Sequence, residues 1–199
     1  AEIDVLREMG VEFKCGVEVG EDITIAQLRE QGYKAFYIAI GAQGGRMTGV
    51  PGEDAVGVET GVDFLRRVNL NEEGVKLSGK TVVIGGGNVA VDVARTALRT
   101  GSSDVSMFCL ESRDIMPAAD DEVAEAEEEG IVVNNSWGPK EILTENGKVT
   151  AVVFKKCISV LDENKRFAPK YDEEELLTVP CDQVLLSIGQ SIKWGALLE

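Results

Sequence analysis

The sequence predicts an α/β fold with a parallel sheet, organised around one strand, one glycine-rich turn and one helix. Thr81 to Ile84 are β-branched and apolar, as a strand buried on both faces requires. Three glycines, Gly85 to Gly87, follow without a spacer. The next residues place small and apolar side chains at helical spacing, namely Val89, Ala90, Val93, Ala94, Ala97 and Leu98. A strand, a glycine turn and a helix in this order indicate a Rossmann-like dinucleotide-binding unit.

The glycine turn predicts a site for the diphosphate of a dinucleotide. Gly85 permits the tight turn, and Gly87 lacks the side chain that would keep a diphosphate away from the backbone. Ala90 is small enough at its position for the helix to pack closely on the strand. The free N–H groups at the start of the helix, at Asn88 and Val89, then face the anion. The alternative interpretation is a glycine-rich turn in an ordinary parallel sheet.

Length and composition fit one large domain, or one whole domain with part of another. The chain has 199 residues, of which 44% are hydrophobic, and a mean hydropathy of -0.02. Its net charge of -15 would repel a phosphate backbone, so nucleic acid is not an expected partner. The sequence has no apolar run long enough to span a bilayer and no signal peptide at its start. We therefore expect no membrane partner and a cytoplasmic location.

Cysteine and histidine usage argues against several kinds of catalytic site. The absence of histidine removes the commonest general base and the commonest metal ligand. No tyrosine is followed by a lysine four positions later, as a Tyr/Lys proton relay requires. The cysteines form no C-x-x-C pair, which argues against zinc, an iron-sulfur cluster and a redox dithiol; they are Cys15, Cys109, Cys157 and Cys181. We expect no metal and no catalytic side chain.

Capping and turn signals divide the rest of the chain into elements. Thr24 and Gln27 match a capping box, and glycines follow several of the expected helices. Helices are expected at residues 1–9, 24–31, 60–68, 88–99 and 120–129. Strands are expected at residues 11–13, 35–40, 81–84, 104–110, 131–134 and 182–188, with an antiparallel meander formed by 141–144, 149–159 and 176–179. The polar segment 69–80 is expected to be a linker, and the acidic run 120–129 a solvated helix face rather than a metal site.

Four segments together resemble the flavin-dependent pyridine-nucleotide oxidoreductases. They are the glycine turn at Gly85, the segment from Arg113 to Ala118, and two apolar strands that run into glycine, at Tyr37–Ala42 and Val184–Gly189. Over nearly the whole chain the sequence is similar to the glutamate synthase small (beta) subunit and its relatives, which include the flavin module of dihydropyrimidine dehydrogenase. The resemblance implies that a hydride passes from NAD(P)H to FAD, and that electrons then pass to a partner subunit or module.

The resemblance also implies a division into domains. Residues 1–77 correspond to a partial FAD-domain segment and a linker, residues 78–187 to the NAD(P)-binding domain, and residues 188–199 to the start of the return to the FAD domain. The family's FAD-binding glycine turn would precede residue 1, and its last FAD segment would follow residue 199. We therefore expect FAD to be a cofactor of the full-length protein, with its domain completed by missing flanking sequence, and this fragment to be inactive alone.

The end of the second strand of the sheet predicts which nucleotide is bound. Glu111 stands 21 positions after Ala90, near the interval of about 20 at which an acid reaches the adenosine ribose in this fold. A carboxylate there accepts bonds from both ribose hydroxyls, and repels a 2′-phosphate about 4 Å away by up to ~4 kcal/mol. Relatives that use NADPH carry paired arginines where Leu110 and Glu111 stand, so NAD(H) is favoured over NADP(H). Arg113, after Ser112, is still able to bind a phosphate or stack on adenine. The alternatives are a surface acid and a solvated charge.

The resemblance assigns further residues to the nicotinamide end of the site. It places Asn88 beside the nicotinamide pocket and Asp92 near the carboxamide, although Asp92 is equally placed to pair with an arginine on its own helix. Gly189 and Gln190 are expected to bring backbone close to the nicotinamide or the flavin, with an ordinary turn as the alternative. The favoured function is the nicotinamide-dinucleotide-binding part of a flavoprotein oxidoreductase. A flavin-free NAD-binding regulatory or adaptor module, and a structural domain with an empty site, are the other hypotheses.

Overall fold

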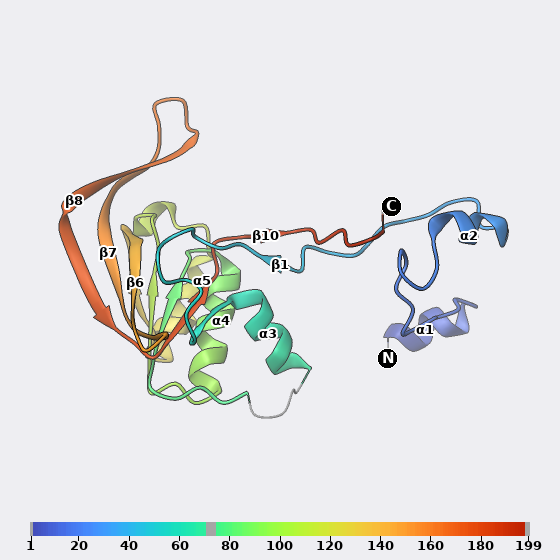
Figure 1. The fold of residues 1–199 in the computed structure, drawn as a ribbon, viewed down its shortest axis with the longest axis horizontal. Coiled ribbons are helices and arrows are strands. Elements are labelled where there is room, and N and C mark those ends of the chain that lie inside the picture. Colours follow the sequence, from blue (N-terminus) through green and yellow to red (C-terminus); the bar gives the residue numbers. More distant parts are fainter. Residues whose placement is uncertain (1, 71–74, 198–199) are drawn as a thin grey trace. The chain divides into compact units, whose positions relative to one another are not determined.

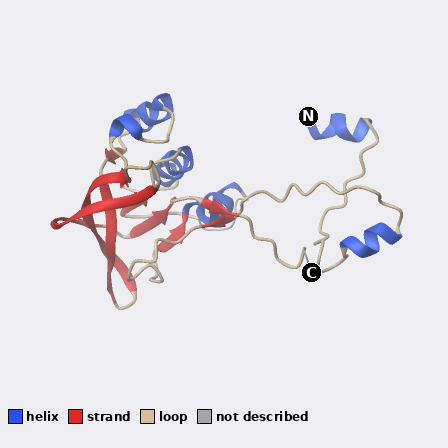
Figure 2. Ribbon diagram, turned by 90° about the horizontal axis from the view of Figure 1, so that it is seen from above, coloured by secondary structure: helices blue, strands red, loops and turns tan. Residues whose placement is uncertain are grey.

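The computed structural model describes residues 2–70 and 75–197, which form two compact units. The first unit contains the residues up to Gly41 and those from Ile192 onward, and the second runs from Ala42 to Ser191. All the strands that the structure describes belong to the second unit (Figures 1 and 2). The expected linker at 69–80 is described in part, because its residues 71–74 lie outside the described residues.

The first unit contains two short helices, α1 (Glu2–Glu8) and α2 (Ile25–Glu30). The capping box is confirmed, because the Thr24 hydroxyl accepts from the Gln27 N–H and the Gln27 side chain accepts from the Thr24 N–H. The strands expected at 11–13 and 35–40 do not form in the described structure. An apolar strand needs paired neighbours on its edges. No described strand pairs with the second of these segments, and its Tyr37 side chain is 94% exposed.

The second unit is built on a five-stranded parallel sheet with the order β2-β9-β3-β4-β5. The strands are β2 (Val58–Thr60), β3 (Lys80–Ile84), β4 (Asp104–Phe108), β5 (Val132–Asn134) and β9 (Gln183–Leu186). Its helices are α3 (Gly61–Asn69), α4 (Asn88–Arg99), α5 (Asp120–Glu128) and the 3-10 turn η1 (Arg113–Ile115). In β3, Val83 packs into the cluster formed with the helices, whereas Val82 and Ile84 belong to the cluster on the other face. Burial on both faces explains the continuous apolar run of this strand.

An antiparallel meander covers the face of the sheet opposite the helices. It consists of β6 (Trp137–Glu145), β7 (Lys148–Leu161) and β8 (Phe167–Pro180). The buried Phe154 of β7 stacks on Phe108, the last residue of β4, with 4.1 Å between ring centroids. A two-stranded ribbon, formed by β1 (Gly44–Gly45) and β10 (Gln190–Ser191), completes the unit. The predicted α/β fold with a parallel sheet and a meander is therefore confirmed.

Within the second unit, the largest difference from the expected elements is the length of β8. The sequence predicts a strand at 176–179, whereas the structure extends it to the stretch from Phe167 to Pro180. The acidic run from Asp172 to Glu175 gives no sequence signal for a strand, because most of these side chains face solvent and are not part of a hydrophobic core. The expected helices at 60–68, 88–99 and 120–129 agree with α3, α4 and α5 to within a residue at each end. The predicted domain boundaries at 77/78 and 187/188 stay a prediction.

Candidate dinucleotide site

A cavity of about 730 Å³ opens in the second unit at the carboxyl edge of the parallel sheet. Its walls come from the glycine turn after β3, the ends of β4 and β9, the meander, and the segment that follows β1. The predicted site residues that line it are Gly85, Gly87, Asn88, Val89, Glu111, Gly189 and Gln190. Ala90, Asp92, Ser112 and Arg113 are not among the residues that line it. Open parallel sheets bind ligands at this edge.

Each glycine of the turn meets a different constraint. Gly85 has a φ of +148°, and a Cβ there would lie 2.3 Å from the Ser187 carbonyl oxygen, so backbone packing excludes any side chain. A Cβ at Gly86 would lie 2.9 Å from the Cys109 Cβ and 3.0 Å from the Glu111 Oε2. A Cβ at Gly87 would meet no atom within 4 Å. The space in front of Gly87 therefore belongs to the cavity, and folding does not require a glycine there.

The start of α4 presents backbone donors to the cavity. Gly87 is the N-cap, and no side chain caps the helix. Its carbonyl accepts from the Ala90 N–H at 2.8 Å. Among the described residues, none accepts a hydrogen bond from the N–H groups of Gly87, Asn88 or Val89. Uncommitted N–H groups at the positive end of a helix dipole form a binding site for an anion.

The loop before α5 is fastened to the glycine turn. The Ala118 N–H donates to the Gly86 carbonyl at 3.0 Å, and the Ala119 N–H donates to the Asn88 Oδ1 at 2.9 Å. Pro117 of this loop lines the cavity. Asn88, which the resemblance places beside the nicotinamide, therefore has its side-chain oxygen engaged in holding this loop. Its amide nitrogen is not part of that bond.

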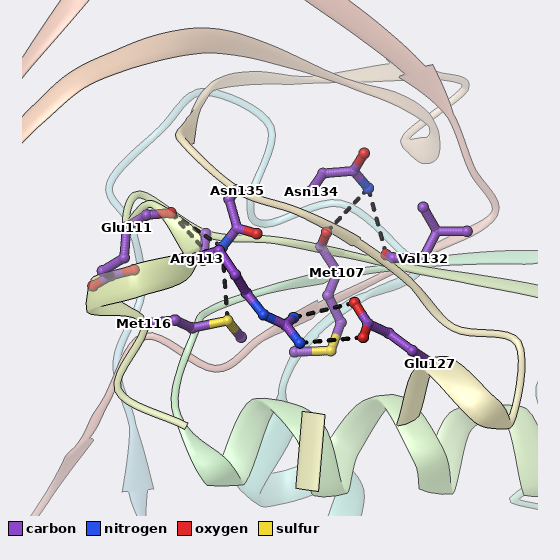
Figure 3. A network of polar contacts seen from close by, with 9 residues as sticks. Met107, Glu111, Arg113, Met116, Glu127, Val132, Asn134 and Asn135 are labelled. Carbon is purple, nitrogen blue, oxygen red and sulfur yellow. Dashed lines mark hydrogen bonds and ion pairs between the residues drawn. The ribbon is translucent and has the colours of Figure 1, made fainter. Parts of the chain in front are cut away.

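Glu111 lies at the tip of β4, over the glycine turn. Its backbone carbonyl accepts from the Asn135 Nδ2 at 3.2 Å (Figure 3). The same carbonyl accepts from the Ser136 backbone N–H at 2.9 Å, and the two bonds fix the strand tip. Its carboxylate reaches the turn at Gly86. Leu110 and Glu111 both line the cavity. The acid and the free donors of α4 therefore share one wall of the same cavity.

The Arg113 side chain points toward α5 and not toward the cavity, where a bound phosphate would lie. Its guanidinium donates two hydrogen bonds to the Glu127 carboxylate of α5, at 3.1 and 3.2 Å, and extends toward that helix (Figure 3). Ser112 precedes η1, and its hydroxyl bond to Asp114 holds the pKa of that carboxyl below its usual value. Neither Ser112 nor Arg113 is brought to the cavity wall.

Asp92 is exposed on α4, and no ion pair joins it to the arginines of its own helix in the described structure. Those arginines, Arg95 and Arg99, pair instead with Glu129 at the end of α5. Their hydrogen bonds hold the pKa of the Glu129 carboxyl below its usual value. The alternative interpretation of Asp92 as a helix-surface ion pair with Arg95 or Arg99 is therefore not observed. Ala90 is fully buried, in keeping with close packing of α4 on the sheet.

The sequence did not predict two groups of residues that line the cavity. Arg46 is the one basic residue among those that line the cavity, and its N–H donates to the Gly189 carbonyl at 3.1 Å. Trp137, Phe167 and Tyr171 form an aromatic wall from the meander. No local motif marks either group, because both reach the site through strand pairing across more than a hundred residues or through the fold of the meander.

The cavity holds one thiol, that of Cys109. Burial, and after it the neighbouring Glu111 carboxylate, raise the pKa of the Cys109 thiol to about 11. The thiol is therefore protonated at neutral pH, and a protonated thiol is a poor nucleophile and metal ligand.

Among the described residues, no group of three His, Cys, Asp or Glu side chains is arranged to hold a metal ion. In the same part of the chain, no helix is long and apolar enough to cross a membrane.

The sheet, the meander and the glycine turn at the start of α4 define a Rossmann-like FAD/NAD(P)-binding fold. The family model described as pyridine nucleotide-disulphide oxidoreductase matches residues 4–195, and the chain belongs to this family. The predicted similarity to the glutamate synthase small subunit and its relatives is confirmed.

Three relatives illustrate the range of the family. The chain is 36% identical to the NADP(+)-dependent formate dehydrogenase subunit beta of Moorella thermoacetica, covering 96% of this chain and 27% of that protein. It is 35% identical to the glutamate synthase (NADPH) small chain of Halomonas elongata, covering 93% and 41%. It is 31% identical to the NAD-dependent dihydropyrimidine dehydrogenase subunit PreT of Escherichia coli K12, covering 100% and 43%. The chain thus spans less than half the length of each.

Among solved structures, Mycobacterium tuberculosis FprA in complex with NADPH matches with a TM-score of 0.76 and 25% identity. The match covers 87% of this chain and 54% of that chain. The His57Gln mutant of FprA matches with a TM-score of 0.79 and 24% identity, covering 95% of this chain and 58% of that chain. At this identity the match is evidence for the fold alone. These structures belong to the same class of FAD/NAD(P)-binding fold, so the fold that the sequence predicts has solved examples.

Proposed function

We propose that this chain is the nicotinamide-dinucleotide-binding part of a cytoplasmic flavoprotein oxidoreductase, in which a hydride passes from NADH to FAD. The observation that carries the proposal is the free N–H row at Gly87, Asn88 and Val89, which opens on a cavity of about 730 Å³. A volume of this size is in the range of small-molecule and cofactor sites. The diphosphate of the dinucleotide rests on these donors, where the helix dipole favours an anion.

The preference for NADH follows from the charges at the tip of β4. Glu111 lines the cavity and presents acceptors to the two ribose hydroxyls of NADH. Arg113, the cation that follows β4 in the sequence, is bound to Glu127 and does not line the cavity. A 2′-phosphate at this position meets an acid and no arginine from β4. The relatives include proteins named for NADP and proteins named for NAD, so the names of the relatives do not decide between the two nucleotides. The proposed preference for NADH rests on the charges at this position.

The residues of this chain have binding and orienting roles. The α4 donors hold the diphosphate, Glu111 holds the ribose, and Gly189 and Gln190 bring backbone to the opposite side of the same cavity. A bound NADH supplies the hydride, and positioning and exclusion of water are what the protein adds. No side-chain acid or base is required, which agrees with the high pKa of Cys109 and the absence of histidine.

The exposure of the described part of the first unit bears on where FAD binds. The segment that the resemblance assigns to the flavin domain, residues 37–42, is exposed throughout. In this proposal, flanking sequence outside this chain completes the FAD site. Several relatives are named as subunits, in agreement with an electron-accepting partner subunit or module.

Calorimetric titration of the chain with NADH, NADPH and FAD tests the proposal. We expect saturable binding of NADH, weaker binding of NADPH, and little or no binding of FAD. Binding of neither nucleotide would overturn the proposal and favour a structural domain. Tighter binding of NADPH than of NADH would overturn the assignment of Glu111 while leaving the dinucleotide site in place.

A further inference from the structure

Two of the three residues of the aromatic wall, Phe167 and Tyr171, belong to the β7–β8 hairpin, which overhangs the sheet, and the third, Trp137, is the first residue of β6. Phe154 of β7 stacks on the last residue of β4, so β7 beyond Phe154 and the paired part of β8 extend past the carboxyl edge. In Figure 1 the tip of this hairpin projects beyond the rest of the meander. Phe167, Pro169 and Tyr171 alternate along β8, and all three line the cavity.

Two of the aromatic residues lie next to the strand tip that carries Glu111. The backbone N–H of Trp137 donates to the Cys109 carbonyl at 2.8 Å. At Gly138, a Cβ would lie 2.5 Å from the Tyr171 ring and 2.7 Å from the Leu110 side chain. The glycine therefore leaves room for the Tyr171 ring to pack beside Leu110. The Tyr171 ring therefore lies next to the residue that precedes Glu111, and Trp137, which also lines the cavity, is joined to the same strand tip through its backbone.

The Tyr171 ring is held in place from its own sheet. The Lys155 ammonium lies 4.1 Å from the centre of the ring, and it also pairs with Glu173 at 2.8 Å. Burial, and then the charges of Cys157 and Glu173, raise the pKa of the Tyr171 hydroxyl, so the ring is neutral at physiological pH. The Trp137 ring has a similar neighbour in Lys156, at 4.7 Å. Fixed, neutral aromatic rings are suited to stacking on a nucleobase.

We propose that Tyr171, with Trp137 beside it, forms the stacking surface for the adenine of the dinucleotide, and that the β7–β8 hairpin thereby selects ligands that carry a nucleoside. This inference rests on the proposed function, because it assigns the adenosine end of the same site. The adenosine ribose at Glu111 brings the attached base to this side of the cavity. A ligand that has the diphosphate but lacks the base gains nothing from these rings.

The test uses the full chain with Trp194→Phe, because Trp137 is then the one remaining tryptophan of the two. Trp194 belongs to the first unit and does not line the cavity. ADP-ribose, which has adenosine and diphosphate but no nicotinamide, should quench Trp137 emission on saturation. Ribose 5-phosphate and inorganic diphosphate should leave the emission unchanged at the same concentrations.

Three variants then measure the contribution of the ring. Tyr171→Leu removes the aromatic face, and should weaken binding of NADH and ADP-ribose about tenfold or more. Tyr171→Phe retains the face, and should bind within about twofold of the unsubstituted chain. Ile158→Ala, on β7 but off the cavity wall and 67% exposed, is the matched control and should also stay within about twofold.

The outcomes separate this inference from the proposed function. Two results would overturn the stacking surface and leave the dinucleotide site in place. One is a Kd for NADH that Tyr171→Leu changes by less than about twofold, and the other is binding of ADP-ribose without quenching of Trp137. Binding of neither NADH nor ADP-ribose to the unsubstituted chain overturns both. If Tyr171→Leu fails to fold, the quenching experiment, together with retained binding by Tyr171→Phe, decides the question.

Discussion

Replacing Gly87 with alanine should weaken nucleotide binding and leave folding nearly unchanged. The backbone of Gly87, with φ -95° and ψ 173°, is one that alanine adopts freely, and the added Cβ would meet no protein atom within 4 Å. Alanine is a poorer N-cap than glycine, which lowers the free energy of unfolding by roughly 0.5–1 kcal/mol. Alanine also reduces the conformational entropy of the unfolded chain, which raises the free energy of unfolding by about 0.4–1 kcal/mol. The two effects cancel to within ~0.5 kcal/mol, or a change in Tm of about 2 °C.

Binding should respond much more strongly. The added methyl group lies in the space where the diphosphate approaches the N–H groups of Gly87, Asn88 and Val89. Loss of one charge-assisted hydrogen bond costs about 1.5–3 kcal/mol, which raises the Kd for NADH about ten- to a hundredfold. Calorimetry measures the Kd, and thermal unfolding measures the stability of the same sample.

Gly130→Ala is the converse control. Gly130 follows α5 with φ +94°, and a Cβ there would also meet nothing within 4 Å, but the conformation is strained for any residue with a side chain. This variant should lose about 1–2 kcal/mol of stability and keep its affinity for NADH. If Gly87→Ala binds NADH as tightly as the unsubstituted chain does, the diphosphate does not lie at the start of α4, and the reasoning is refuted.

Three further predictions concern the same unit. Gly85→Ala should prevent stable folding, because its Cβ would overlap the Ser187 carbonyl; circular dichroism of a well-folded variant would contradict this. Glu111→Gln should weaken NADH binding about fivefold and strengthen NADPH binding, so that the ratio of the two Kd values changes at least about tenfold; an unchanged ratio would remove Glu111 from the ribose site. Burial raises the pKa of the Cys109 and Cys181 thiols to about 11 and about 12, above their ordinary 9.0, so the folded state holds these protons longer than the unfolded state. The free energy of unfolding should therefore fall as pH rises from about 9 to about 12, and replacing both thiols with alanine should flatten that slope in denaturant titrations.

The centre of the fold was predictable because its signals are local. β3, the glycine turn and α4 each follow from neighbouring residues: β-branched apolar residues, glycines without a spacer, and an apolar stripe at helical spacing. The position of Glu111 was predictable for a related reason, since strand order and loop lengths are regular in this fold. β3, the glycine turn and α4 depend on short-range chemistry that a single sequence displays, and Glu111 follows from its distance along the chain from α4.

The missed features depend on contacts between distant residues. Arg46 reaches the cavity through the pairing of β1 with β10, and the Tyr171 ring through the register of a long hairpin with several bulges. The apolar segment 35–40 has the composition of a buried strand, yet composition does not supply the neighbouring strands that it needs. The sequence leaves Arg113 able to bind a phosphate or adenine, or to be a solvated charge, and it does not indicate the ion pair with Glu127 of a separate helix.

Backbone amide NMR of the 21.4 kDa chain during titration with NADH tests the central claim most directly. The account predicts that the largest shifts belong to the amides of Gly87, Asn88 and Val89, with Glu111 shifting at the same ligand concentration. Saturable binding that leaves these four amides unmoved, and shifts resonances elsewhere in the chain, would contradict it.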